Sequence, residues 1–365
     1  MVMHIKGCVC LVEKLMARRA TFVGLDPYKL ERVHVTDKEL GHGAYATVME
    51  VEYMGLKCAG KKIHDILLQQ GEMSYTVHRF EEECRILSQV RHPNVVQFLG
   101  VYYQRGARVP ILVMELLPTN LSSEIKDKGI LPKELSYSIL HDVALGLHYL
   151  HTKTPPIIHR DLSANNVLLT ANMMAKISDL GMARIVNLNS LQVSRMTETP
   201  GTPAYMPPEV MVANPNYDKS VDEFSYGVLM IHILSGQWPE PQCSQIRMEA
   251  GKMIPVSEAG RREGYLTDVG HSHPLMELIL KCISNDPQTR ASAREIVQRL
   301  ADVVYEYPDP FVTRLNSLCS FGAHEMARQT ARLKSKETAV SLQKRNLRLL
   351  CSLSTCVRVE SVACL

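Results

Sequence analysis

Apolar and polar residues alternate in two short segments, residues 33–35 and 48–53, on either side of a segment that contains two glycines. Alternation with a period of two is typical of β-strands, and glycine permits the tight turn that joins them. We therefore predict a β-hairpin whose tip is Gly41-His-Gly-Ala-Tyr-Ala46. The next predicted strand carries Cys58-Ala-Gly-Lys61.

A helical period follows in two longer segments. Residues 79–90 place apolar side chains on one stripe and three glutamates on the remaining surface, which predicts an amphipathic helix. Pro132 opens a second predicted helix that ends by Pro155, with apolar residues at Leu135, Ile139, Val143, Leu147 and Leu150. Its histidines are expected on the helix surface: His141, His148 and His151.

Short apolar runs predict the remaining strands. Residues 95–103 and 111–116 are rich in β-forming residues and flank a polar segment, so they predict a second hairpin. Residues 157–169 have the pattern of a strand, a polar turn and another strand, and a further strand is predicted at 173–177. A strongly apolar helix is predicted to begin at Asp222.

The composition is that of a folded protein. The chain has 365 residues, of which 45% are hydrophobic and 22% are charged. Because a single core rarely exceeds about 250–300 residues, we expect one two-lobed unit with extensions. The formal net charge is only +3, so no nucleic-acid partner is expected.

The cysteines and the apolar runs bear on the compartment. The 10 cysteines are scattered without a CxxC pair or zinc-ligand spacing, which favours reduced thiols and a cytoplasmic protein. No apolar run reaches the about 18 residues that a transmembrane helix needs. The apolar patch at residues 8–12 is too short for a secretory signal and is followed at once by charged residues.

The densest group of polar side chains lies in the predicted turn within residues 157–169: His159, Arg160, Asp161 and Asn166. Unpaired polar groups are costly to bury, so their position between apolar runs needs a chemical reason. A carboxylate with an amide five residues later suits a loop in which the acid orients a hydroxyl group and the amide holds a metal ion.

Two further segments indicate phosphate chemistry. Glycines at the hairpin tip would let backbone amides approach phosphate oxygens, and Lys61 on the next strand could reach the same phosphates. Asp179-Leu-Gly181 follows a predicted strand. A carboxylate beside a glycine turn suits Mg²⁺, which prefers few protein oxygens together with phosphates.

Taken in order, these segments resemble the motifs of the eukaryotic protein kinases. GHGAYATV from Gly41 and CAGK from Cys58 are similar to the glycine-rich loop and the strand-three lysine, with Ala46 in place of the third glycine. HRDLSANN from His159 resembles the catalytic loop, and Asp179-Leu-Gly181 resembles the DFG element with leucine for phenylalanine.

Three later segments continue the same order. Residues 201–209 look like the GTxxYMxPE element with Pro207 for alanine, and residues 222–227 match DxWSxG except for Phe224. Residues 285–290 resemble the late helix junction of the family. A surface salt bridge would explain the charged residues of any one motif taken alone. It does not explain why seven motifs occur in the family's order.

The resemblance implies an α+β fold with two lobes, a small β-rich N-lobe and a larger, mainly helical C-lobe. It divides the chain into an N-terminal extension at 1–33, a kinase domain at 34–305 and a basic, partly helical tail at 306–365. Within the domain it places the N-lobe, hinge and C-lobe at 34–114, 115–118 and 119–305.

The resemblance also implies roles in the transfer of a phosphoryl group from ATP to a protein substrate. Lys61 would place the ATP phosphates and pair with Glu83, with Glu82 as the alternative partner. Asp161 would orient the attacking hydroxyl group and accept its proton. The implied Mg²⁺ ligands are Asn166 and Asp179. The residues implied to line the ATP site are Leu40, Gly41, Gly43, Val48, Ala59, Lys61, Met114, Glu115, Leu117 and Leu168.

Regulatory and supporting residues follow from the same motifs. Arg160 could pair with a phosphate added to Thr197 or Thr199, and such a pair would order the polar segment around them. Thr202 and Tyr205 are implied to contribute to substrate docking. Structural roles are implied for His159, Glu209, Asp222 and Arg290: His159 would stack with Leu180, Asp222 would hold the catalytic loop through its backbone, and Arg290 would pair with Glu209.

The residue that accepts phosphate stays open. Serine/threonine kinases commonly have lysine two residues after the catalytic aspartate, where this chain has Ser163, whereas tyrosine kinases lack the GTxxY segment that Thr202 and Tyr205 supply. This mixture is similar to the tyrosine-kinase-like group, whose members mostly phosphorylate serine and threonine. We therefore expect a serine/threonine kinase in intracellular signalling. The alternatives are a tyrosine or dual-specificity kinase and a pseudokinase scaffold.

The segment after Pro308 and Pro310 is basic, and its apolar residues recur every seven positions. The positions that would complete a coiled-coil seam are polar, so a coiled coil is not expected. We expect a partly helical, solvated tail, with binding of a partner as the alternative.

Overall fold

The structure is a computed structural model that describes most of residues 28–304. The gaps are 44, 65–72, 106, 108, 186–201, 212–217, 240–245, 250–251, 256–265 and 267. All described residues belong to one compact unit, residues 1–310. The basic tail lies outside the described residues. Within the described ranges, no helix combines the length and the apolar character needed to cross a bilayer.

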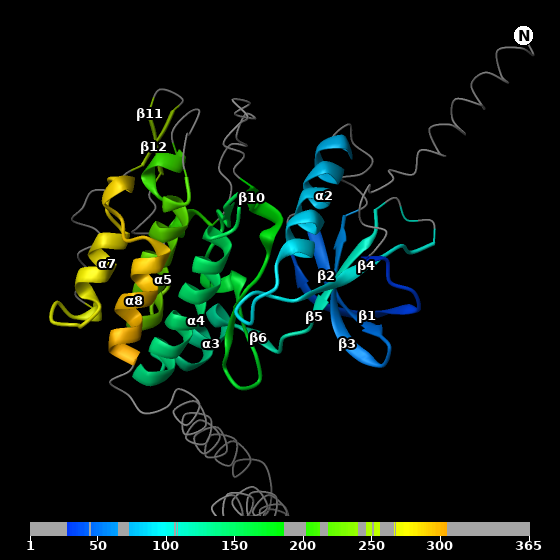
Figure 1. The fold of residues 1–365 in the computed structure, drawn as a ribbon, viewed down its shortest axis with the longest axis horizontal. Helices are drawn as coiled ribbons and strands as arrows, with labels where there is room; N and C mark the ends of the chain where they lie inside the picture. Colours follow the sequence, from blue (N-terminus) through cyan, green and yellow to red (C-terminus); the bar gives the residue numbers. More distant parts are fainter. Residues whose placement is uncertain are drawn as a thin grey trace, which may run out of the picture. The chain divides into compact units, whose positions relative to one another are not determined.

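A five-stranded antiparallel sheet with the order β1-β2-β3-β5-β4 forms the small lobe (Figure 1). Helix α2 (Met73–Gln89) lies against this sheet, and its apolar stripe shares a core with Phe98 and Leu112. Both predicted hairpins and the predicted helix are present. The strands are β1 (Val33–His42), β2 (Ala46–Tyr53), β3 (Leu56–Ile63), β4 (Phe98–Tyr102) and β5 (Ile111–Glu115).

A short N-terminal segment covers the edge strand β4. The Leu30 N–H donates to the Val101 carbonyl at 2.8 Å, and the Leu30 side chain is buried in the core of the sheet. Gly100 permits this approach, because a Cβ atom there would lie only 2.3 Å from the Tyr28 carbonyl oxygen. Residues 28–33, predicted to belong to an extension, thus pack on the small lobe.

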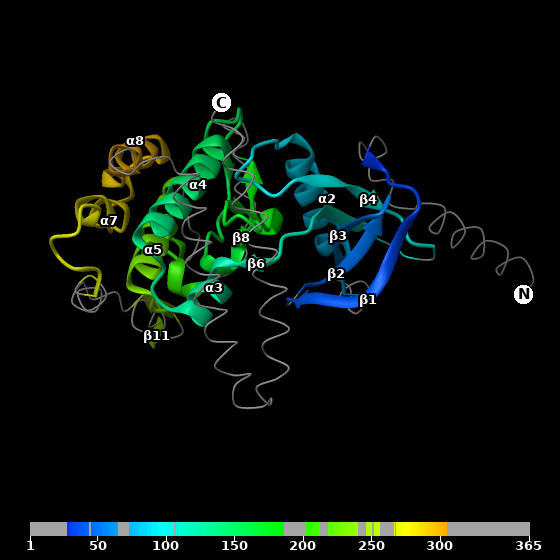
Figure 2. The same cartoon turned by 90° about the horizontal axis from the view of Figure 1, so that it is seen from below.

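The second lobe is mainly helical and is built around α5 (Ser220–Ser235). Nearly every residue of α5 is buried, as expected of a helix that is apolar on all sides. Helix α4 (Lys133–His151) packs against both α5 and α8 (Figures 1 and 2). The other helices are α3 (Leu121–Lys128), α7 (Met276–Cys282) and α8 (Ala293–Val304).

One prediction about α4 is wrong. His151, expected on the helix surface, is buried in the last turn of α4. Its partner is Asp222 of α5, which lies 71 residues later in the chain. The helical period could not reveal this contact, because it depends on how two helices far apart in sequence pack together.

Short strands fix both ends of the polar loop within residues 157–169. The predicted strands at its ends are β7 (Ile157–Ile158) and β8 (Val167–Leu169), and they belong to different sheets. Strand β7 pairs with β10, and β8 lies between β6 and β9. Each end of the loop is therefore anchored separately. The remaining strands are β6 (Thr119–Asn120), β9 (Ala175–Ile177), β10 (Arg184–Ile185), β11 (Ile246–Glu249) and β12 (Lys252–Pro255).

The predicted α+β architecture with two lobes is confirmed. The sheet and α2 occupy one side of Figure 1 and the helices of the second lobe occupy the other. Segments of both lobes contribute to the site described next.

Candidate active site

Asp222, in the first turn of α5, holds the backbone of the loop between β7 and β8. Its carboxylate is fully buried and accepts hydrogen bonds from the N–H groups of His159 and Arg160, both at 2.8 Å. Arg160 has a φ of 65°, in the left-handed region that is unfavourable for most residues. The two bonds therefore stabilise a strained turn. The backbone contact predicted for Asp222 is present.

His151 binds the same carboxylate from α4. Its Nε2 lies 2.8 Å from Oδ2 of Asp222, and its Nδ1 lies 3.9 Å from Oε1 of Glu223. Burial would raise the pKa of Asp222, but the hydrogen bond and charge of His151, with further contributions, outweigh burial and lower this pKa. Burial raises the pKa of Glu223. Asp222 is thus ionised behind the loop at neutral pH.

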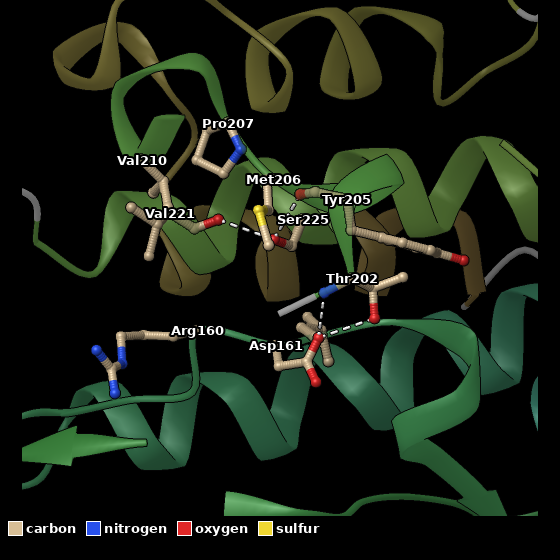
Figure 3. Close-up of a pocket in the computed structure, with 10 residues that line it drawn as sticks. Arg160, Asp161, Thr202, Tyr205, Met206, Pro207, Val210, Val221 and Ser225 are labelled. Carbon is tan, nitrogen blue, oxygen red and sulfur yellow. Dashed lines mark hydrogen bonds between the residues drawn. The ribbon is translucent and has the colours of Figure 1, made fainter. Parts of the chain in front are cut away.

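Asp161 lies in this loop and is bound on two sides. Nδ2 of Asn166 donates to the Asp161 carbonyl at 2.8 Å and to its Oδ2 at 2.9 Å. The N–H and the hydroxyl group of Thr202 donate to Oδ1 of Asp161 at 2.7 and 2.9 Å (Figure 3). Burial raises the pKa of Asp161, while His159 and Thr202 act in the opposite direction. The structure therefore brings together Asp161, Asn166 and Thr202.

Lys61, Glu83 and Asp179 meet from three separate elements. Nζ of Lys61, on β3, donates to both carboxylate oxygens of Glu83 on α2, at 2.8 and 3.0 Å. It also donates to Oδ1 of Asp179 at 2.8 Å. The choice between the two candidate glutamates is settled, because Glu82 instead faces Arg85 at 3.9 Å.

The charges of this cluster support one another. Burial would lower the pKa of Lys61, but Asp179 and Glu83 outweigh burial and raise it. The attraction of Lys61 lowers the pKa of Asp179 to about 2 against the effect of burial. Burial raises the pKa of Glu83, and Lys61 opposes this change. Lys61 and Asp179 are consequently both charged at neutral pH.

Asp179 and Asn166 offer the oxygen atoms that a magnesium ion requires. Lys61 and the Gly181 N–H both bind Oδ1 of Asp179, so Oδ2 is the outer oxygen of a side chain that is 45% exposed. The amide nitrogen of Asn166 faces Asp161, so its amide oxygen points the other way. Carboxylate and amide oxygens are suitable Mg²⁺ ligands. This donor set fits the predicted ion.

Strand pairing places several of the predicted ATP-site residues close together. Val48 pairs with Lys61, and Ala59 pairs with Met114. The N–H of Gly43 donates to the Ala46 carbonyl at 2.9 Å and so closes the hairpin tip. The other predicted residues lie on β1, directly after β5 and on β8: Leu40 and Gly41, Leu117, and Leu168.

Glu115 at the end of β5 is bound from two directions. Its Oε1 accepts a hydrogen bond from the Gln97 N–H at 2.7 Å. Nζ of Lys176 forms an ion pair with the same carboxylate and lies 2.7 Å from Oε1 and 2.9 Å from Oε2. Because Lys176 lies on β9, this pair connects the sheet of the small lobe to the large lobe. Sequence reasoning did not single out Lys176. The only available signal was its position three residues before Asp179.

A pocket opens beside Asp161. Figure 3 shows Thr202 pointing toward the Asp161 carboxylate and Arg160 extending away from it. Apolar side chains contribute most of the remaining wall. The lining residues are Arg160, Asp161, Leu162, Thr202, Tyr205, Met206, Pro207, Val210, Val221 and Ser225. The carboxylate therefore has an apolar surface next to it.

Tyr205 supports this wall from inside. Its side chain is buried, and its hydroxyl group binds Nδ1 of His232 at 2.6 Å and accepts the Ala164 N–H at 3.4 Å. The hydroxyl group of Tyr205 is thus engaged in internal bonds while the residue lines the pocket, and the docking role of Tyr205 stays a prediction. Thr202, which binds Asp161 directly, is the better placed of the two.

The three other predicted structural residues also have polar partners. Nη2 of Arg290 donates to Oε2 of Glu209 at 2.9 Å, which is the predicted pair. His159 is buried, and its Nε2 lies 2.9 Å from the Ser178 carbonyl, while its stacking with Leu180 stays a prediction. Thr197 and Thr199 lie outside the described residues, so their relation to Arg160 also stays a prediction.

Comparison with known proteins adds independent support. Residues 34–300 match the family described as the protein kinase domain. The serine/threonine-protein kinase VIK of Arabidopsis thaliana is 32% identical over 273 residues, 74% of this chain and 60% of that protein. Serine/threonine-protein kinase 12 of the same plant is 30% identical over 310 residues, 84% of this chain and 63% of that protein.

A third relative is much longer. Serine/threonine-protein kinase WNK3 of Mus musculus is 30% identical over 271 residues, which are 72% of this chain but only 14% of that protein. The chain thus spans less than two thirds of the length of each of these curated relatives.

Proposed function

The chain belongs to the protein kinase family, and we propose that it transfers the γ-phosphoryl group of ATP to serine and threonine hydroxyl groups of protein substrates. The observation that carries this proposal is the joint assembly of two clusters. One is Lys61 with Glu83 and Asp179, and the other is Asp161 with Asn166. A scaffold without turnover would have no need of both.

Each cluster has its own task in the proposed reaction. Lys61, oriented by Glu83, binds the phosphates of ATP with a charge that its two carboxylate partners maintain. Asp161 accepts a hydrogen bond from the substrate hydroxyl group and takes its proton as the new bond to phosphorus forms. The bond that breaks joins the γ-phosphorus to the bridging oxygen, and ADP leaves with that oxygen.

The position of Thr202 has a consequence for this step. Its N–H and hydroxyl group occupy only Oδ1 of Asp161, so Oδ2 is the oxygen that can face a substrate hydroxyl group. Asn166 binds that same Oδ2 and so fixes its direction. Thr202 and Asn166 together orient the carboxylate.

We propose Asp179 and Asn166 as the residues that hold Mg²⁺ in the loaded enzyme. Their outward oxygens support this assignment. A bound Mg²⁺ would neutralise charge on the phosphate oxygens of ATP. The low pKa of Asp179 keeps this ligand ionised throughout the physiological range.

The names of the relatives favour serine and threonine as acceptors, since each is named a serine/threonine-protein kinase. Ser163, which left the acceptor open at the level of sequence, is fully buried. A residue without exposed surface does not select the acceptor by touching it. We propose that Thr202, Met206 and Pro207, which line the pocket beside Asp161, contribute to the choice.

The test is transfer of radiolabelled phosphate from ATP, with the wild-type chain compared with Asp161→Asn. We expect labelling by the wild type and a large loss in the variant. Phosphoamino-acid analysis of the product should give phosphoserine and phosphothreonine. Predominant phosphotyrosine would overturn the proposed acceptor, and equal labelling by both proteins would overturn the role of Asp161.

We also propose two features that follow from the motifs. Phosphate on Thr197 or Thr199 would pair with Arg160 and raise activity, and phosphatase treatment that leaves turnover unchanged would contradict this. A cytoplasmic location is the second feature. It is supported by free, buried thiols at Cys58, Cys84 and Cys282. Fractionation of cells that produce the protein would test it.

A further inference from the structure

Arg79 of α2 contacts two segments that are far apart in the sequence. Its Nη2 donates to the Gly181 carbonyl at 2.9 Å, and its guanidinium carbon lies 5.1 Å from the centre of the Tyr45 ring. Attraction between a cation and an aromatic ring is effective within about 6 Å. Tyr45 lies at the tip of the β1–β2 hairpin, and Gly181 follows Asp179. Arg79 thus joins the hairpin tip, α2 and the Asp179 turn.

The contact with Gly181 is coupled to the charged cluster. Arg79 lies four residues before Glu83, so both side chains are on the same face of α2. A Cβ atom on Gly181 would lie 3.0 Å from Nζ of Lys61 and 3.1 Å from Oε2 of Glu83, which shows how closely this glycine packs against the ion pair. The charge of Arg79 also acts to lower the pKa of Glu83, against the effect of burial.

The contact with Tyr45 reaches the part of the small lobe that would cover a nucleotide. The Tyr45 carbonyl accepts a hydrogen bond from the His64 N–H at 3.1 Å, which ties the backbone of the tip to the end of β3. The ring itself is 55% exposed, and Arg79 packs against it. If the tip moved away from α2, this ring contact would be lost while the Gly181 contact would remain.

We propose that Arg79 is a positioning residue that couples closure of the hairpin tip over ATP to the placement of Glu83 and the Asp179 turn, with the Tyr45 ring as the link. The inference rests on the proposed ATP-binding function. Coupling of this kind is reciprocal. When ATP closes the tip, the Tyr45 ring would hold Arg79 and thereby α2 in place. In the other direction, an α2 that places Glu83 correctly would favour the closed tip.

A double-mutant cycle on nucleotide binding tests the link. The probe is the Mg²⁺ complex of the non-hydrolysable analogue AMP-PNP, titrated calorimetrically into the full chain. Tyr45→Leu should weaken binding about two- to five-fold, the range that one exposed cation–π contact supplies. In an Arg79→Met background the same substitution should change binding by less than about 1.5-fold, because the partner is already gone.

Conservative variants separate positioning from simple support of the fold. Tyr45→Phe keeps the ring and should lie closer to the wild type than Tyr45→Leu. Arg79→Lys keeps the charge but not the planar group, so it should lie between the wild type and Arg79→Met. Arg79→Gln, which removes the charge, replaces Arg79→Met in the cycle if Arg79→Met does not fold. Arg85→Met is the matched control, because Arg85 lies on the same helix and its side chain is 55% exposed. It should bind AMP-PNP as the wild type does.

Hydrogen exchange of α2 provides a readout that does not depend on affinity. AMP-PNP should slow exchange in residues 77–89 of the wild type, and it should do so less in Tyr45→Leu. Equal effects of Tyr45→Leu in the wild-type and Arg79→Met backgrounds would overturn the coupling and leave the ATP site intact. Absence of AMP-PNP binding by the wild type would overturn the coupling together with the proposed function.

Discussion

Asp179 and Asp222 are each held at 2.8 Å by a basic side chain, yet they lie in opposite environments. Asp179 is 45% exposed, and its partner Lys61 comes from the other lobe. Asp222 has no exposed surface, and its other partners are two backbone N–H groups of the neighbouring loop. A carboxylate bonded to a basic side chain thus lies at a partly exposed site in one case and in the interior of the large lobe in the other.

The difference teaches how burial separates the two roles. In the proposed function the exposed carboxylate keeps one oxygen for Mg²⁺, so its loss should affect chemistry. The buried carboxylate has both oxygens engaged, so its loss should affect folding and the shape of the loop. An unpaired buried polar group carries a large cost, whereas an exposed group can be satisfied by water.

Substitution at Asp179 should give the largest effect on activity. Asp179→Asn removes the outward oxygen charge, and we expect phosphoryl transfer to fall about 10²–10⁴-fold. The midpoint of thermal unfolding should fall less than in Asp222→Asn, because Asp179 is 45% exposed and water can satisfy the groups left behind. Radiolabel transfer and calorimetry check the two parts. A fall in the midpoint as large as that of Asp222→Asn would break the comparison.

Substitution at Asp222 should show the reverse order of effects. Asp222→Asn turns one acceptor into a donor that faces the N–H groups of His159 and Arg160. We expect a loss of roughly 3–5 kcal/mol in the free energy of unfolding, measured by urea denaturation. The pKa of Asp222 is lowered in the fold, so the wild type loses this contribution as the pH falls below about 3.9, and the variant does not. Normal stability of the variant at pH 7 would contradict the buried role.

Thr202 offers a smaller test through the pH dependence of the rate. Its hydroxyl group favours the ionised form of Asp161, and burial opposes it. Activity requires the ionised form, so the rate should fall as the pH decreases through the pKa of Asp161. Thr202→Val removes the hydrogen bond from the Thr202 hydroxyl group to Oδ1 of Asp161, so the pKa of Asp161 should rise. The fall in rate should then occur at higher pH. A profile of kcat/KM against pH measures the shift, and a shift to lower pH would show that another group governs the acid limb.

Substitution of Ser163 should have the smallest effect on the free energy of unfolding. It tests whether a buried polar group without a partner contributes to stability as the buried Asp222 does. Its hydroxyl group is buried and has no hydrogen-bond partner among the described residues. Removal of an unsatisfied buried group costs little or stabilises. Ser163→Ala should therefore unfold within about 1 kcal/mol of the wild type in urea. A larger loss would mean that the hydroxyl group has a partner in the folded protein.

Two kinds of signal made part of the fold and site predictable from sequence: a period within one segment, and the order of motifs along the chain. Lys61 and Asp161 were predicted because the segments around them follow a known order, and the distance to His92-Pro-Asn94 in the family's pattern favoured Glu83 over Glu82. The hairpins and α4 were visible through their periods of two and about 3.6 residues. The hairpins and α4 depend on residues that are close together in the chain, whereas the site residues were recognised from motifs that recur in a fixed order.

The remaining contacts depend on packing between distant segments. His151 was assigned to the surface because nothing within α4 reveals Asp222. The ion pair of Lys176 with Glu115 and the contacts of Arg79 could not be inferred either, because they join residues 61 and 102 positions apart. A pairing of this kind becomes visible only when the lobes are folded together.

The N-terminal segment over β4 sets a limit on how this kinase can be shortened. Strand β4 is the last strand of the sheet, so a chain that began at residue 34 would expose the Val101 carbonyl and the cavity now filled by Leu30. Uncovered edge strands readily pair with other molecules. A fragment cut at the boundary of the family match would therefore be prone to self-association.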